Sequence, residues 1–125
     1  MNKVFGGDIM ICYNRKDIEE MKDFEGEFYM PNALFNTMQY KLVRLEVKFG
    51  YTACLNALLK EPSFNEANKA YVLADNPLIT EILKSLAHKL ADQDKVNGYL
   101  DELEEAGLLE RNGNEVYLKK VCNIF

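Results

Sequence analysis

The chain has 125 residues, 48% of them hydrophobic, and a formal net charge of −5 from 15 basic and 20 acidic side chains. This length suits one domain and excludes a catalytic domain joined to a regulatory domain, and the apolar content is enough for a core without metals or disulfides. Because the net charge is negative, the protein does not attract polyphosphate over its whole surface, so any nucleic-acid contact must be local.

Residues 1–27 are predicted to form a strand and a helix that extend the main domain on its N-terminal side. The run 9–13 has the composition of a strand, and Asn14 is placed to cap a helix over residues 15–24. The sequence leaves open whether this extension completes a sheet, swaps between subunits or lies loosely. Its helix has a narrow apolar stripe, typical of packing against another element, formed by Ile18, Met21 and Phe24.

Residues 28–125 are predicted to form the main domain. Apolar residues recur at helical spacing from 38 to 49, which predicts a core helix. Gly50 then indicates a kink, or the joint to a second helix over residues 51–60. Residues 61–68 follow as a polar connector.

The second half of the chain has clear start and stop signals. Residues 69–74 are predicted to form a short strand. Asn76 is then placed to cap a helix that Pro77 opens and that runs to Leu90 with a wide apolar face. After a tight break, Asp92 is placed to cap another helix, which ends where Gly107 supplies the left-handed residue.

The chain is predicted to end in a β-hairpin, because runs 108–111 and 115–119 flank the turn sequence Asn112-Gly113-Asn114. Helix, short strand, helix, tight turn, helix and hairpin is the order of a winged helix-turn-helix. We therefore expect an α+β, mainly α fold in which the hairpin and the short strand cover three helices as a three-stranded sheet. Its inner face is expected to be lined by Leu73, Leu108 and Val116.

Four segments carry a family resemblance: FYMPN at 28–32, KLVRL at 41–45, KFGY at 48–51 and LDELEEAGLLE at 100–110. Together they resemble the N-terminal winged-helix domain of phage replisome organisers and DnaD-like primosome proteins, over about residues 28–121. The resemblance implies a role in replication initiation in a bacterium, phage or mobile element. It also implies self-association and docking to other replication proteins.

The helix over residues 93–106 stands where this fold usually reads the major groove of DNA. Phosphates would repel it, because it carries five acids against Lys95 alone. Gln93, Lys95 and Asn97 are its candidate donors, and the alternative is that they are solvated surface residues. The acids are Asp94, Asp101, Glu102, Glu104 and Glu105.

The candidate binding residues lie mostly outside that helix. Lys41, Arg44 and Lys48 are spaced at i, i+3 and i+7, which predicts a basic stripe on the first core helix. The stripe is read as a contact for phosphate or an acidic partner, or as an ordinary solvated edge. Lys119 and Lys120, at the end of the wing, are a second candidate, and Lys95 is the remaining one.

No enzyme, metal or cofactor is expected. His88 has no cysteine or paired acid at ligand spacing, and Gly6-Gly7 lacks the residues of a phosphate-binding loop. The cysteines Cys12, Cys54 and Cys122 are far apart and in apolar contexts, so we expect all three to be small buried side chains. The alternative is a surface thiol at Cys122.

Two functions fit these observations. One is a replication-associated module that acts mainly through protein contacts and self-association, with weak or no DNA binding and no membrane or small-molecule partner. The alternative is a transcription regulator that dimerises through residues 1–30 and binds duplex DNA through its wing and basic stripe. A third possibility is a fragment of a longer protein. Without an apolar span or a signal-peptide pattern, a cytoplasmic location is expected.

Overall fold

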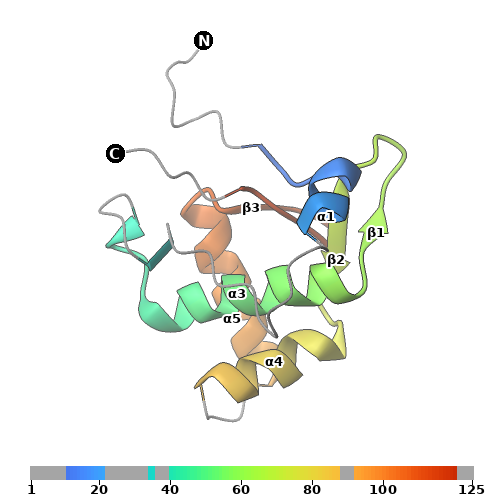
Figure 1. Cartoon of the computed structure of the whole chain (residues 1–125). Helices are drawn as coiled ribbons and strands as arrows, with labels where there is room; N and C mark the ends of the chain where they lie inside the picture. Colours follow the sequence, from blue (N-terminus) through green and yellow to red (C-terminus); the bar gives the residue numbers. More distant parts are fainter. Residues whose placement is uncertain (1–10, 22–33, 36–39, 88–91, 121–125) are drawn as a thin grey trace.

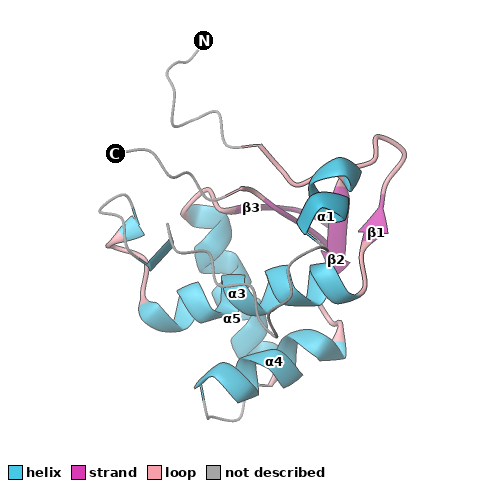
Figure 2. Cartoon of the chain, viewed as in Figure 1, coloured by secondary structure: helices cyan, strands magenta, loops and turns pink. Residues whose placement is uncertain are grey.

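The structure is a computed structural model that describes residues 11–21, 34–35, 40–87 and 92–120. Helix α3 crosses the centre of the fold, with α4 on one side, α5 behind it and a small antiparallel sheet on the other side (Figure 1). This is the expected mainly helical, winged-helix-like α+β fold, and Figure 2 shows its helices and strands by colour. The elements are α1 (Arg15–Met21), α3 (Leu45–Lys60), β1 (Ser63–Phe64), β2 (Ala70–Leu73), α4 (Pro77–Ala87), α5 (Gln93–Glu105), β3 (Leu109–Asn112) and β4 (Glu115–Leu118).

The sheet has four strands in the order β1-β2-β4-β3. The predicted hairpin is confirmed: Asn112 pairs with Glu115, and Gly113, the first residue of the two-residue loop, has a φ of +62°. The prediction of three strands is wrong, because β1 lies in the segment that we interpreted as a polar connector. A strand of two residues has too little alternation to be recognised from sequence, and its pairing with β2 defines it.

The inner face of the sheet differs from the prediction at one residue. Leu108 and Val116 are fully buried as expected, but Leu73 is 42% exposed. Val72 pairs with Val116 and is therefore on the inner face, and the two-residue period of a strand sends Leu73 to the opposite face.

The joint between two helices, one of the two predictions for Gly50, is also wrong, because α3 continues through it as a single helix. A Cβ atom at Gly50 would lie 3.1 Å from the Cβ of Tyr99 on α5. The glycine therefore serves the close approach of two helices, which local sequence patterns do not report.

The start of α3 differs from the prediction as well. Arg44 is its N-cap residue, with extended backbone angles of φ −62° and ψ 149°. Before it, the backbone N–H of Val43 donates to the carbonyl of Tyr40 at 3.1 Å, so residues 40–43 form a turn. The described helix thus begins at Leu45, and Met38 lies outside the described residues.

The capping predictions in the second half of the chain are confirmed. The side chain of Asn76 accepts from the backbone N–H of Leu78 at 2.9 Å, just where Pro77 opens α4. Asp92 accepts from the backbone N–H of Lys95 at 2.9 Å at the start of α5. Gly107 follows α5 with a φ of +78°, and the predicted helix end at Leu90 lies outside the described residues.

Residues 11–21 lie against the sheet. Asn14 caps α1 by accepting from the backbone N–H of Asp17 at 2.9 Å, and the Asp17 carboxylate accepts from the backbone N–H of Asn14 at 3.0 Å. Two isolated bridges, Cys12 to Lys119 and Asn14 to Lys69, join this segment to β4 and β2. Ile18 is fully buried in the core. The domain boundary after residue 27 stays a prediction, and the predicted helix end near Phe24 is outside the described residues.

Cys12 and Cys54 are free and buried, as expected, whereas Cys122 and His88 lie outside the described residues. Burial raises the pKa of the Cys54 thiol to about 12. Across the described ranges, no helix is both long and apolar enough to cross a membrane. In the same ranges, no three His, Cys, Asp or Glu side chains gather where they could hold a metal ion.

Candidate nucleic-acid interface

Helix α5 packs one face onto the core and turns its acids outward. Val96, Leu100 and Leu103 are buried against α3 and the sheet. Among the predicted acids, Glu102 is partly exposed and the others are exposed, namely Asp94, Asp101, Glu104 and Glu105. The surface that reads DNA in other winged helices is therefore negative here.

The candidate donors at the start of α5 are mostly used within the protein. The Gln93 side-chain amide donates to the carbonyl of Ala74 at 2.9 Å and to the Asn97 side-chain oxygen at 3.0 Å. The bond to Ala74 joins the start of α5 to the residue after β2, and the bond to Asn97 lies within α5. Lys95 is exposed, with no ion pair to any described residue.

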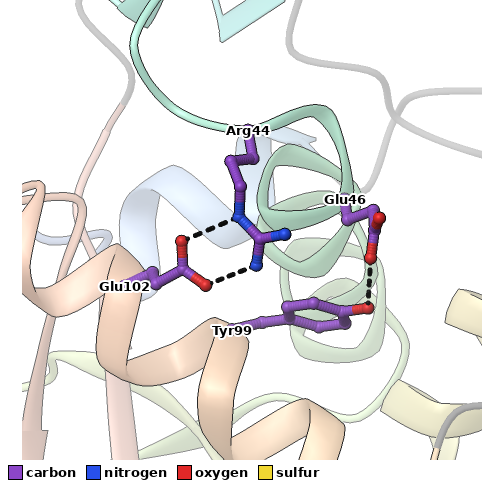
Figure 3. Close-up of polar contacts among 4 residues, drawn as sticks. All are labelled: Arg44, Glu46, Tyr99 and Glu102. Atoms are coloured by element: carbon purple, nitrogen blue, oxygen red, sulfur yellow. Dashed lines mark hydrogen bonds and ion pairs between the residues drawn. The ribbon is translucent and has the colours of Figure 1, made fainter.

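A polar clamp, formed by Arg44, Glu46, Tyr99 and Glu102, joins the start of α3 to α5 (Figure 3). The Arg44 guanidinium donates to both oxygens of Glu102, from Nε at 3.1 Å and from Nη2 at 2.6 Å. The Tyr99 hydroxyl donates to Glu46 at 3.0 Å. The bond from Arg44 lowers the pKa of Glu102, and Glu102 raises the pKa of Arg44.

The Arg44–Glu102 pair matters more for charge than for stability. Its side chains are 56% and 43% exposed, and solvent screens ion pairs at such positions. The bidentate pair nevertheless occupies the guanidinium donors that would otherwise form hydrogen bonds to a phosphate. Arg44 is therefore neutralised by the same helix that carries the surface acids.

The predicted basic stripe is not formed. Lys41 is exposed in the turn before α3, Arg44 caps the helix, and Lys48 is inside it with only 9% of its surface exposed. The stripe requires one continuous helix from 41 to 48, and the turn at residues 40–43 interrupts it. Lys48 is buried because α3 is covered on nearly every face from Val47 to Leu58.

The cations of the wing are paired as well. Lys119 lies 3.2 Å from Glu110 on β3, and Lys120 lies 2.8 Å from Asp17 on α1. Arg111 on β3 contacts Asp101 on α5 at 2.9 Å. We call α5, the β3–β4 hairpin with Lys119 directly after it, and the α3 N-cap residue Arg44 the α5–hairpin face. Its cations are Arg44, Lys95, Arg111 and Lys119. Of these, Lys95 has no acidic partner among the described residues.

The tyrosines that could stack on bases have structural roles. Tyr51 is fully buried, and its hydroxyl donates to the carbonyl of Lys119 at 2.6 Å. Burial raises its pKa well above the usual value. Tyr117 is also buried and donates to Glu115 at 2.6 Å. Both side chains therefore stabilise the fold and present little surface to a ligand.

Sequence reasoning did not single out the cations at the opposite edge of the sheet. Arg15, Lys16 and Lys69 are all exposed there. The adjacent pair Arg15-Lys16 was a visible signal, but its proximity to Lys69 depends on the bridge between Asn14 and Lys69.

The described residues thus define a winged-helix-like domain with an acidic helix in the recognition position. No protein-family model matches the sequence, and no curated protein matches it. A solved structure described as "N-Terminal domain of DNA binding protein" is similar to it, with a TM-score of 0.51 and 21% identity, covering 98% of this chain and 86% of that one.

A second similar structure is described as "Structure of Rep-DNA complex". Its TM-score is 0.51 and its identity 24%, and the match covers 94% of this chain and 84% of the other. At these identities the two solved structures are similar to this chain in fold alone.

Proposed function

We propose that the protein is a replication-associated winged-helix module that acts mainly through protein contacts and self-association and binds DNA weakly or not at all. The observation that carries this proposal is the α5–hairpin face, where acids are exposed and three of the four cations are paired with acids. No catalytic activity, membrane contact or small-molecule ligand forms part of the proposal, and we place the module in the cytoplasm.

Electrostatics supports a protein partner over groove reading. Duplex DNA carries one phosphate charge per roughly 1.7 Å, so a helix with five acids and Lys95 alone would be repelled at close range. Arg44 and Arg111 could reach phosphates only by giving up their bonds to Glu102 and Asp101. Because each arginine would lose its bond to an acid, the binding free energy gained from a phosphate contact would be smaller.

The replication class is supported by two likenesses. The sequence resembles replisome organisers and DnaD-like proteins of bacteria, phages or mobile elements, and the fold resembles a DNA-binding domain and a Rep protein in complex with DNA. The second candidate is a dimeric winged-helix transcription regulator that binds duplex DNA, and the DNA in the Rep complex supports the DNA-binding part of it.

A salt titration with random duplex DNA separates the two candidates. We expect fluorescence anisotropy at physiological salt to give a dissociation constant in the weak non-specific range, about 10⁻⁴ to 10⁻⁶ M. Submicromolar binding that falls steeply with the logarithm of the salt concentration would support the regulator and contradict the module.

Self-association is tested separately by size-exclusion chromatography with light scattering. We expect an oligomer whose population rises with protein concentration. A monomer at every concentration would remove self-association from the proposal.

A further inference from the structure

A second group of cations lies at the edge of the sheet far from α5. The strand order places β1 at the opposite edge from β3, the strand that Arg111 ties to α5 (Figure 1). There the Asn14–Lys69 bridge joins the residue before α1 to the residue before β2. We call Arg15, Lys16 and Lys69 the α1–β1 corner, and all three side chains are exposed.

The Arg15 guanidinium is held in a defined orientation. Its Cζ atom lies 4.0 Å from the centroid of the Phe64 ring on β1, and its Nε donates to the side-chain oxygen of Asn68 at 3.1 Å. The backbone N–H of Arg15 also donates to the carbonyl of Asn68 at 2.8 Å. Its two terminal nitrogens have no hydrogen bond or ion pair to any residue that the structure describes.

The loop that holds Asn68 is itself ordered by local bonds. The Asn65 side chain accepts from the backbone N–H groups of Ala67 at 2.8 Å and Lys69 at 3.0 Å. Asn68 has a φ of +63° and donates from its backbone to the carbonyl of Asn65 at 2.9 Å. Arg15 is therefore positioned before any ligand arrives, which reduces the entropy cost of binding.

Acids also lie near the corner, but none that the structure describes is bound to one of its cations. Asp17 is engaged by Lys120 at 2.8 Å and by the backbone of Asn14. Glu66 lies in the β1–β2 turn, and Glu19 and Glu20 lie further along α1. None of them forms an ion pair with a corner cation within the described ranges.

An exposed, oriented guanidinium with two unoccupied terminal nitrogens suits a planar group with two oxygens, because its donors form a fixed fork. We propose that the α1–β1 corner is a phosphate-contact site for a nucleic-acid backbone, with Arg15 gripping one phosphate and Lys16 and Lys69 contacting its neighbours. This rests on the proposed function and names the surface through which the module makes its weak DNA contact.

The test is a pair of matched lysine variants in the duplex anisotropy assay at low salt. Lys69→Gln removes a corner charge, and Lys95→Gln removes the same charge from an exposed lysine on α5. We expect Lys69→Gln to weaken binding and to reduce the salt slope by about one, since one phosphate contact is lost. Lys95→Gln should leave both quantities unchanged.

Arg15→Lys tests whether the planar guanidinium geometry contributes to binding in addition to the charge. It keeps the positive charge but loses the bond to Asn68 and the planar stack on Phe64. We expect affinity to fall by about 3- to 10-fold with little change in salt slope, because the number of released counterions is the same. Circular dichroism melting confirms that each variant is folded.

Each contrary result has its own meaning. Loss of binding with Lys95→Gln but not Lys69→Gln would place the contact on α5 and overturn both this inference and the proposed function. Equal losses in the two variants, or competition by polyglutamate as strong as by duplex DNA of equal charge, would overturn the phosphate site. No duplex binding by the unaltered chain, even at low salt, would overturn this inference and leave the protein-contact function standing.

Discussion

The α5–hairpin face and the α1–β1 corner contain similar numbers of basic side chains but differ in what those side chains contact. On the α5–hairpin face, Arg44, Arg111 and Lys119 each lie within 3.2 Å of an acid from another element. At the corner, Arg15 is stacked on an aromatic ring and bonded to an amide. The charge that a ligand can use therefore depends on cross-element pairing, and a count of lysines and arginines along the chain does not reveal it.

The two regions are also anchored differently. Helix α5 has three buried residues and packs closely against α3 at Gly50, whereas α1 has seven residues and buries Ile18. The corner is thus the smaller unit, anchored by Ile18 on α1 and by backbone bonds between residues 11–15 and the sheet. Variants that weaken each anchor test this difference.

The largest effect is expected from Ile18→Ala. Removing this fully buried side chain leaves a cavity between α1 and the core, so urea denaturation should show a loss of about 2–5 kcal/mol in the free energy of unfolding. Ile11→Ala is the matched control, because Ile11 is 59% exposed, and it should change stability by less than about 0.5 kcal/mol. An Ile18→Ala variant as stable as the control would show that α1 is not part of the core.

The next largest effect is expected from Gly50→Leu. The new side chain would collide with Tyr99, whose Cβ lies 3.1 Å from the position of the added Cβ, and overpacking of this kind costs about 1–3 kcal/mol. The control is Gly98→Ala on α5, which has no atom within 4 Å of the added Cβ and should stabilise the helix by about 0.5–1 kcal/mol. Thermal unfolding of both variants measures the contrast, and a destabilised Gly98→Ala would contradict it.

The smallest effect is expected from Glu102→Gln, read as a function of pH. Because Arg44 lowers the pKa of Glu102 in the folded protein, this carboxylate stabilises the fold above its unfolded pKa of about 4.5 and loses that contribution as the pH falls through the folded value. Glu102→Gln should therefore be slightly less stable at neutral pH and less sensitive to acid below pH 4.5.

Glu104→Gln is the control for that variant, since Glu104 is exposed on the same helix and has no ion pair to a described residue. Denaturation curves at several pH values should show that the acid sensitivity of Glu104→Gln is close to that of the unaltered chain. If Glu102→Gln were as acid-sensitive as the unaltered chain, the pair with Arg44 would make no contribution to the free energy of unfolding.

Features that depend on neighbouring residues were predictable from the sequence. The caps at Asn14, Asn76 and Asp92, and the glycines at 107 and 113, act through bonds and backbone angles within a few residues. They were enough to place most of the helices and the hairpin. They also identified the acidic helix α5, because its charges are adjacent in the chain.

Features that depend on the approach of distant segments were decided by the tertiary structure. Gly50 looked like a helix break and is a contact with Tyr99, and β1 exists because β2 pairs with it. Arg44 looked like a member of a basic stripe, but its bond to Glu102 joins residues 58 positions apart. A side chain's charge is written in the sequence, whereas its neutralisation requires an opposite charge within a few ångströms, and only the folded chain determines that distance.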